Sequence, residues 1–256
     1  MQNNTFSALF IGQNLVKLSS VASTNNYLKE LVSNSGPLVE GTVIMADHQF
    51  AGKGQLQNVW ESEDGKNLTI SILLKPTFLT VGQQFELNKA VSLALLDVLS
   101  PLLGPEVSIK WPNDILVSGK KIAGILIENS VQGSRWKQAV VGIGLNVNQT
   151  QFSPNLTRAT SIKNVLQTEY NLNSLLADLC VAVERRYLQV RAQKFADLHR
   201  DYLQHLFKFG EQSKFRVANE LIEAEIMGVS PTGLLELHTS KGTQIVGFKE
   251  IAFCFD

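Results

Sequence analysis

The sequence predicts an α+β protein, in which a mixed, mostly antiparallel sheet is flanked by helices and followed by a small C-terminal β-barrel. Three observations support this prediction. Short apolar runs joined by tight turns fill residues 107–147, as expected for a meander of strands. Apolar residues with helical spacing fill 83–99 and 174–191. After Phe209-Gly210 the pattern changes to short alternating runs, which are typical of a small antiparallel barrel.

The elements before residue 105 follow from the period of their apolar residues and from the residues at their ends. Ser23-Thr24-Asn25 offers N-cap side chains to a helix over about 26–32. A longer helix over 83–99 is expected to end near Pro101, because proline lacks an N–H. Weakly alternating or β-branched runs predict the strands of this half, which are 15–18, 42–46 and 68–74.

The centre of the chain is expected to turn sharply after Trp111. Pro112 fixes its own φ and bars the residue before it from helical conformation, so a strand should end at Trp111. Ser118-Gly119 predicts a hairpin turn. The strands predicted here are 107–111, 115–117, 122–127 and 139–147, followed by helices at 161–166, 174–191 and 194–207 and by barrel strands at 213–217, 221–229, 234–238 and 244–248.

Length, charge and cysteine content limit the class of protein. The 256 residues have room for one large domain, which we assign to 1–209, and a small one at 210–256. The 23 basic and 23 acidic residues leave no net charge that would favour nucleic acid or an anionic membrane. The N-terminus does not resemble a signal peptide, and no segment resembles a membrane span. Cys180 and Cys254 lie far apart in apolar surroundings, as expected for buried thiols of a cytoplasmic protein.

Several common motifs do not fit. Gly52-Lys53-Gly54 lacks the spacing and the ending of a P-loop. Gly142-Ile143-Gly144 lies within a predicted strand, whereas a dinucleotide fingerprint needs a strand-to-helix turn. The four histidines show no metal-ligand spacing, so the sequence assigns no metal ligands. P-loop, Rossmann and metal-centre chemistry are therefore disfavoured.

The most unusual feature is the run Lys110-Trp111-Pro112-Asn113-Asp114, followed after a turn by Gly119-Lys120-Lys121-Ile122-Ala123-Gly124. The hairpin should bring these polar clusters face to face, and such a group suits a phosphate and a hydroxylated ligand better than a core. Three other motifs keep two interpretations each. Residues 52–55 are either an ordinary surface loop or a loop whose backbone N–H groups bind an anion. Ser23-Thr24-Asn25 either caps a helix or contacts a ligand. Asn146 is either a turn residue at the end of a strand or part of a binding site.

These residues resemble the catalytic domain of biotin protein ligases. The resemblance rests on Lys-Trp-Pro-Asn-Asp, on Gly-Lys-Lys-Ile-Ala-Gly-Ile-Leu-Ile-Glu from Gly119, and on Val-Gly-Ile-Gly-Leu-Asn-Val-Asn from Val141. It extends to Ser23-Thr24-Asn25 and to Gln49-x-Ala51-Gly52-x-Gly54 with Trp60. It implies the catalytic fold that these ligases share with class II aminoacyl-tRNA synthetases, and an Src-homology-3-like barrel whose final strand is 248–251.

The resemblance implies a two-step reaction. Biotin and ATP would give biotinyl-5′-AMP and pyrophosphate, and a lysine of a biotin carboxyl carrier protein, such as that of acetyl-CoA carboxylase, would then take the biotinyl group. Mg²⁺ is expected with ATP. Fewer than twenty residues precede the first predicted strand, which implies a monofunctional ligase without a helix-turn-helix domain. The exposed meander offers a surface for a homodimer like those of relatives.

The resemblance also assigns roles to residues. Lys121 would stabilise the transition state in which the biotin carboxylate meets the α-phosphate. Lys53 would close over the adenylate, and Asp114 would either orient the acceptor lysine or help to hold magnesium. The expected biotin contacts are Ser23, Thr24, Asn25, Gln49, Gly52, Gly54, Gln55, Lys121 and Gly124. The expected ATP contacts are Lys53, Trp60, Lys110, Asn113, Asp114 and Asn146.

The glycine loop departs from the family pattern. It is usually Gly-Arg-Gly-Arg-x-Gly-x-x-Trp, whereas here Lys53 and Gln55 replace the arginines and Gln57 replaces a glycine. The second arginine is associated with retention of the adenylate, so Gln55 predicts easier release of the adenylate.

Two alternative functions remain. One is a lipoate or octanoyl ligase or transferase of the same fold, against which Lys-Trp-Pro-Asn-Asp argues, and the other is a non-catalytic biotin- or nucleotide-binding module.

Overall fold

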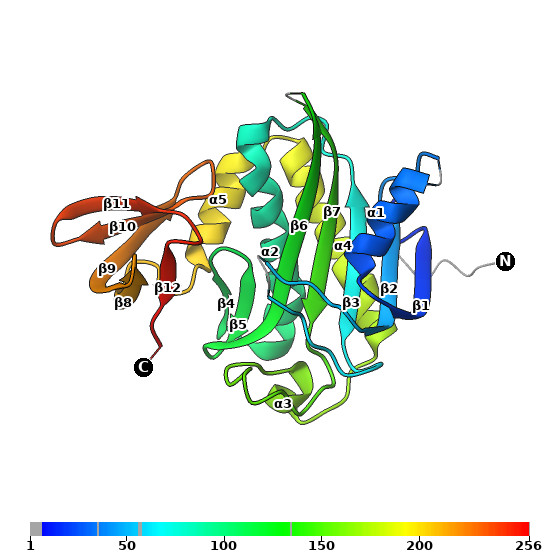
Figure 1. Cartoon of the computed structure of the whole chain (residues 1–256), viewed down its shortest axis with the longest axis horizontal. Coiled ribbons are helices and arrows are strands. Elements are labelled where there is room, and N and C mark those ends of the chain that lie inside the picture. Colours follow the sequence, from blue (N-terminus) through cyan, green and yellow to red (C-terminus); the bar gives the residue numbers. More distant parts are fainter. Residues whose placement is uncertain (1–6, 35, 56–57, 134, 256) are drawn as a thin grey trace.

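A computed structural model describes residues 7–34, 36–55, 58–133 and 135–255, and these form two sheets. The larger sheet has seven strands in the order β1-β2-β3-β7-β6-β5-β4, in which β1 and β2 pair in parallel and the other neighbours are antiparallel. The smaller, C-terminal sheet is antiparallel, with five strands in the order β11-β10-β9-β8-β12 (Figure 1). The predicted α+β class with a mixed, mostly antiparallel sheet is confirmed.

The strands of the larger sheet are β1 (Leu15–Val21), β2 (Val43–Gln49), β3 (Leu68–Leu74), β4 (Val107–Lys110), β5 (Asp114–Val117), β6 (Lys120–Gln132) and β7 (Arg135–Leu145). The helices are α1 (Thr24–Asn34), the 3₁₀ helix η1 (Val81–Gln83), α2 (Gln84–Leu103), α3 (Ile162–Leu166), α4 (Leu172–Arg191) and α5 (Phe195–Gln204). The C-terminal strands are β8 (Gln212–Val217), β9 (Glu220–Val229), β10 (Leu235–Thr239), β11 (Gly242–Val246) and β12 (Ile251–Phe253). None of the helices in the described ranges has the length and apolar character needed to cross a membrane.

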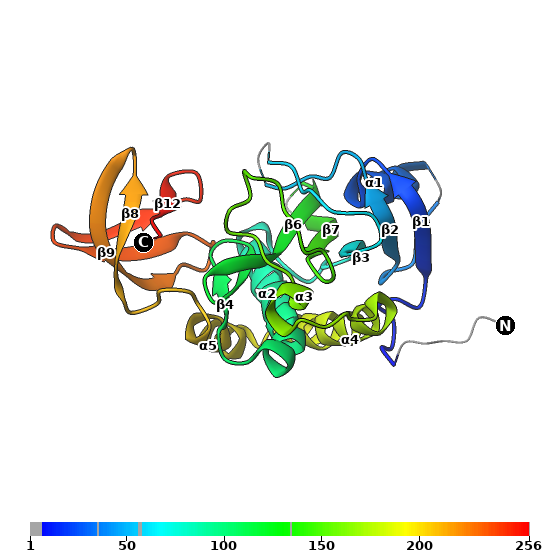
Figure 2. The same ribbon diagram turned by 90° about the horizontal axis from the view of Figure 1, so that it is seen from below.

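Helices cover the two faces of the larger sheet unequally. α2, α4 and α5 pack together on one face, over the main hydrophobic core (Figure 2). α1 lies on the opposite face against β2, β3 and β7, where Leu28, Ile44 and Leu73 form a smaller core. A single short helix on this second face leaves room beside it, over β5 and β6, for a site.

Two predicted helix ends are wrong. α2 continues through Pro101 to Leu103, because Leu102 and Leu103 pack on the main core and compensate for the backbone hydrogen bond that proline cannot make. α5 ends at Gln204, because the following backbone pairs with the edge strand β4. There the Ile109 N–H donates to the His205 carbonyl, and the Ile109 carbonyl accepts from the Phe207 N–H, each over 2.8 Å.

The predicted final strand at 248–251 is also wrong. Residues 248–250 form a turn, in which the Gly247 N–H donates to the Glu250 carboxylate over 2.8 Å and the Glu250 N–H donates to the Gly247 carbonyl over 2.9 Å. The strand β12 begins only at Ile251 and pairs with β8.

Trp111 joins the C-terminal sheet to the larger one. The side chain is buried, its Nε1 donates to the Gly233 carbonyl over 3.0 Å, and its ring lies 6.2 Å from that of Phe248. A Cβ at Gly233 would come within 2.5 Å of the Phe85 ring, so glycine is what lets the backbone approach α2 there. The small sheet is thereby held beside the β4–β5 hairpin.

Candidate active site

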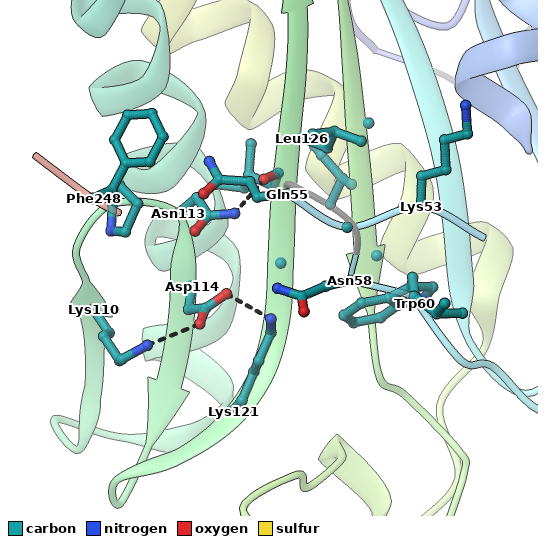
Figure 3. Close-up of a pocket in the computed structure, with 18 of the residues that line it drawn as sticks. Lys53, Gln55, Asn58, Trp60, Lys110, Asn113, Asp114, Lys121, Leu126 and Phe248 are labelled. Carbon is teal, nitrogen blue, oxygen red and sulfur yellow. Dashed lines mark hydrogen bonds and ion pairs between the residues drawn. The ribbon is translucent and has the colours of Figure 1, made fainter. Parts of the chain in front are cut away.

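A cavity of about 390 Å³ lies on the α1 face of the larger sheet, between the N-terminus of α1, the β4–β5 hairpin and the C-terminal sheet (Figure 3). Most of the residues predicted from the sequence line it, namely Ser23, Thr24, Asn25, Gln49, Lys53, Gly54, Gln55, Trp60, Lys110, Asn113, Asp114, Lys121 and Gly124. Gly52 and Asn146 do not line it.

Lys110, Asp114 and Lys121 form a charge cluster at one end of the cavity. Lys110 is the register partner of Asp114 in the β4–β5 hairpin. Asp114 Oδ1 lies 2.6 Å from Lys121 Nζ, and Asp114 Oδ2 lies 3.2 Å from Lys110 Nζ (Figure 3). The Asp114 side chain is 15% exposed, so water screens these attractions less than on an open surface. Two ammonium groups are thus fixed around one carboxylate, and both of its oxygens are engaged.

A β-bulge aims Lys121 into the cavity. The register of β6 against β5 shifts between Ala123 and Lys121, which leaves Ile122 as the extra residue. Ile122 and Ala123 both lie in the core, and Lys121 returns to the cavity side with Gly124. In a regular strand, successive side chains would alternate, and Lys121 would point to the face opposite Gly124.

Asn146 supports this bulge from behind. Its N–H donates to the Ile122 carbonyl, and its Nδ2 donates to the Thr160 carbonyl, each over 2.9 Å. The neighbouring segment pairs with the bulge itself, because the Lys121 N–H donates to the Arg158 carbonyl over 2.6 Å and the Thr160 N–H donates to the Lys121 carbonyl over 2.9 Å. Asn146 is therefore placed to hold the backbone of Lys121 and not to line the cavity.

The ring of Trp60 lies against glycines of the sheet. A Cβ at Gly144 would overlap the indole, and one at Gly124 would come within 3.3 Å of it. Lys121 Nζ lies 5.7 Å from the centre of the Trp60 ring system, within the range of cation–π attraction. Trp60 Nε1 is buried without a hydrogen-bond partner among the described residues.

Gly142 and Gly144 also line the cavity but were not predicted as site residues. A Gly-x-Gly run leaves one face of a strand without side chains, and this pattern could have indicated the site.

The other end of the cavity is a polar pocket of Ser23, Thr24, Asn25 and Gln49 at the N-terminus of α1. The Thr24 N–H and the Thr24 hydroxyl both donate to Gln49 Oε1, over 2.7 and 3.0 Å. Gln49 and Ser23 line the cavity wall, and with Oε1 engaged by Thr24 the Gln49 side chain can meet a ligand through Nε2. Below the pocket, the buried Ser71 Oγ lies 2.8 Å from Thr24 Oγ1 and 2.5 Å from Asn25 Oδ1.

Glu128 closes this network on the side away from Gln49. Asn25 Nδ2 donates to the Leu126 carbonyl over 3.3 Å and to Glu128 Oε2 over 2.8 Å. Lys29 Nζ lies 2.6 Å from Glu128 Oε1. Burial raises the pKa of Glu128, but hydrogen bonds from Lys29 and Asn25, together with the charges of Lys29 and Lys53, bring that pKa below its ordinary value. The side chain is therefore a carboxylate at neutral pH.

Lys53 lines the cavity, but its ammonium group turns away from the charge cluster. Figure 3 shows Lys53 pointing away from Lys110, Asp114 and Lys121. Lys53 Nζ donates to Asn26 Oδ1 over 3.1 Å, at the first turn of α1. Gly52 lies behind the wall, where its carbonyl accepts from the Trp60 N–H over 3.0 Å and a Cβ would overlap the Trp60 backbone. Lys53 therefore lies at the polar pocket and is not part of the charge cluster of Lys110, Asp114 and Lys121.

The C-terminal sheet supplies a wall that the sequence did not predict. Phe248, Phe253 and Phe255 line the cavity, and Lys110 Nζ lies 5.4 Å from the centre of the Phe253 ring. Asn113, facing this wall, donates from Nδ2 to the Ile125 carbonyl over 2.7 Å. The gathering of aromatic residues near the end of the chain is the signal that could have suggested this wall.

The described residues form no group of three or more His, Cys, Asp or Glu that could hold a metal ion. Asp114 is the single carboxylate among the described residues that line the cavity. A metal held by the protein alone does not fit this donor set.

Comparison with known proteins identifies the class to which this fold and site belong. Residues 18–146, half of the chain, match the biotin/lipoate A/B protein ligase family, and the chain belongs to this family.

Individual relatives narrow the comparison. The chain is 29% identical over 235 residues to the bifunctional ligase/repressor BirA of Bacillus subtilis, covering 91% of this chain and 71% of that protein. It is 28% identical over 239 residues to the biotin–acetyl-CoA-carboxylase ligase of Paracoccus denitrificans, covering 91% of this chain and 99% of the relative. The structure of biotin protein ligase from Aquifex aeolicus in complex with biotin and ATP superposes with a TM-score of 0.80 at 25% identity, covering 95% of this chain and all of that one.

Proposed function

We propose that this protein is an ATP-dependent ligase that activates biotin as biotinyl-5′-AMP and transfers the biotinyl group to a lysine of a biotin carboxyl carrier protein. The observation that carries the proposal is a single cavity with the charge cluster at one end and the polar pocket at the other. The Aquifex aeolicus neighbour binds biotin and ATP, and the Paracoccus denitrificans relative is named for acetyl-CoA carboxylase. Both names support these substrates and this kind of acceptor.

The polar pocket suits the cyclic urea of biotin. A urea presents one carbonyl that accepts hydrogen bonds and N–H groups that donate them. Gln49 Nε2 offers a donor, and the hydroxyl oxygens of Ser23 and Thr24 offer acceptors. The valeryl chain of biotin would then run past apolar side chains that line the cavity, which are Ile70, Leu126 and Ile143.

The charge cluster suits the first chemical step. A carboxylate oxygen of biotin attacks the α-phosphorus of ATP, a new O–P bond forms, and the bond to the departing pyrophosphate breaks. Two anions must approach each other, so a fixed cation between them lowers the barrier. The bulge turns Lys121 to the cavity side, which supports this task, and Trp60, Lys110 and Asn113 would then contact the nucleotide.

In the second step the carrier lysine replaces AMP. Its neutral amine attacks the carbonyl carbon of the mixed anhydride, an amide bond forms, and AMP leaves with the bridging oxygen while the amine loses a proton. Mg²⁺ is expected to accompany ATP. Because the described residues build no metal site of their own, phosphate oxygens would supply most of its ligands.

Isotope exchange between pyrophosphate and ATP tests the proposal. Exchange should require biotin and should not be supported by lipoate. Exchange that depends on lipoate or octanoate would favour the rival ligase of the same fold. Binding of biotin without any exchange would instead favour a non-catalytic module.

Gln55 gives a prediction about the intermediate. We expect biotinyl-AMP to leave this enzyme more readily than it leaves a ligase with arginine at that position, because the loop offers less positive charge to the phosphate. Gln55→Arg should therefore slow release, by several-fold, in a rapid-dilution assay with labelled adenylate. Equal release from Gln55→Arg and from the parent enzyme would show that residue 55 does not control retention.

A further inference from the structure

Glu128 is a charged residue just outside the cavity that the proposed reaction does not use. It lies two residues beyond Leu126 on β6, and its side chain is 30% exposed. A simple explanation is a surface ion pair with Lys29, which would matter little. The direct hydrogen bond from Asn25 to Glu128 argues for more, because Asn25 lines the polar pocket.

The two acceptors beside Asn25 determine which way its side-chain amide points. The Leu126 carbonyl and the Glu128 carboxylate carry no proton, so both require the NH₂ group of Asn25. The oxygen of the amide must then face Ser71. Turning the amide over would place its oxygen against a carboxylate and a carbonyl, and this repulsion excludes the alternative.

The orientation of Asn25 is passed on through the Ser71 hydroxyl to the Thr24 hydroxyl. Asn25 Oδ1 has no proton to give, so Ser71 must donate its own proton to that oxygen. The single proton of Ser71 is then used, so at the 2.8 Å contact with Thr24 Oγ1 the Ser71 oxygen accepts from the Thr24 hydroxyl. The Thr24 proton is shared between Ser71 Oγ and Gln49 Oε1, which leaves the Thr24 oxygen as an acceptor toward the cavity. The Thr24 N–H also holds Gln49 Oε1, so Gln49 meets a ligand through Nε2.

We propose that Glu128 is a positioning residue for recognition of the ureido group: through Asn25, Ser71 and Thr24 it fixes the hydrogen-bond polarity of the pocket that meets biotin. This inference rests on the proposed function. Glu128 does not touch the substrate, and its effect is confined to the pocket at the α1 end. The charge cluster at the other end is connected to other residues and should not respond to it.

Glu128→Gln tests the proposal with minimal change of shape. Glutamine has an NH₂ group in place of one carboxylate oxygen, so one of the two positions that accept from Lys29 and from Asn25 would carry a donor instead. We expect KM for biotin in the exchange assay to rise about five- to tenfold, with kcat and KM for ATP within twofold of the parent enzyme. Glu169→Gln, which removes the exposed ion pair with Lys163 at 2.7 Å, is the matched control and should change nothing.

Two further measurements separate positioning from a general loss of structure. Desthiobiotin keeps the urea and lacks the sulfur ring, so its KM should rise by the same factor as that of biotin. In an Asn25→Ala background, Glu128→Gln should add less than twofold, because the residue through which it acts is gone. If turnover is too low to measure, the Kd of biotin for Glu128→Gln and for the parent enzyme can be compared by calorimetry instead of KM.

The results that overturn the inference are distinct from those that overturn the proposed function. If the parent enzyme is active and Glu128→Gln has an unchanged KM for biotin, the positioning role is rejected and the proposed ligase function stands. An equal rise in KM for biotin and for ATP also rejects it, since that pattern indicates a general disturbance. A parent enzyme that shows no biotin-dependent exchange rejects the ligase itself.

Discussion

Replacing Lys121 with alanine is expected to lower biotin-dependent exchange between pyrophosphate and ATP by about 100- to 1,000-fold, the usual cost of losing one fixed donor to a developing charge. The β-bulge turns Lys121 Nζ into the cavity, 2.6 Å from Asp114 and 5.7 Å from the centre of the Trp60 ring system. Most of the loss should appear in kcat, because in the proposed reaction the cation acts where the carboxylate and the α-phosphate meet.

Lys120 is the matched control for this substitution. It is the adjacent residue on β6 and carries the same charge, but it is exposed and does not line the cavity. Lys120→Ala should therefore keep exchange within about twofold, as expected for a surface substitution. Loss of exchange in both variants would show that the hairpin responds to charge in general, whereas full activity in Lys121→Ala would remove Lys121 from the reaction.

Replacing Asp114 with asparagine is expected to lower kcat/KM for the exchange by roughly 10- to 100-fold, which corresponds to about 1–3 kcal/mol for a charged group left without its partner. The carboxylate holds Lys110 and Lys121 through separate oxygens. A neutral amide would leave two ammonium groups facing each other, and Lys121 would be free to leave the position set by the bulge.

A double-mutant cycle tests whether Asp114 acts through Lys121. If it does, Asp114→Asn should have little further effect once Lys121 is alanine, because the group that it positions is absent. Additive losses would instead support a separate task for Asp114, such as orienting the acceptor amine. Glu106→Gln, at an exposed acidic residue just before β4, is the control for a change of charge in this region.

The sequence was most informative where local rules govern the chain. Pro112 lies in the turn between β4 and β5, and Ser118-Gly119 forms the turn between β5 and β6. The φ angle is positive at both Ser118 and Gly119, as a tight two-residue turn requires. The pairing of Lys110 with Asp114 follows from those turns. The predicted approach of the polar clusters is accordingly present in the structure.

Features that depend on distant segments could not be predicted in this way. The bulge in β6 is held by a hydrogen bond from Asn146 to Ile122 and by hydrogen bonds between Lys121 and residues 158 and 160, which no local pattern reveals. Lys53 turns to Asn26 because α1 presents an acceptor there, although its sequence neighbours suggested the reaction centre. The apolar packing of Leu102 and Leu103 similarly carries α2 past Pro101 against the local preference.

The aromatic wall of the cavity has a consequence for the order in which the enzyme becomes competent during its synthesis. Residues 23–146 contain the polar pocket and the charge cluster, whereas Phe248, Phe253 and Phe255 come much later in the chain. A nascent chain would therefore carry both ends of the site while one side of the cavity still faced water. Because the wall comes from a later part of the chain than the polar pocket and the charge cluster, the capacity to shelter a reactive adenylate would arise later in synthesis than either end of the site.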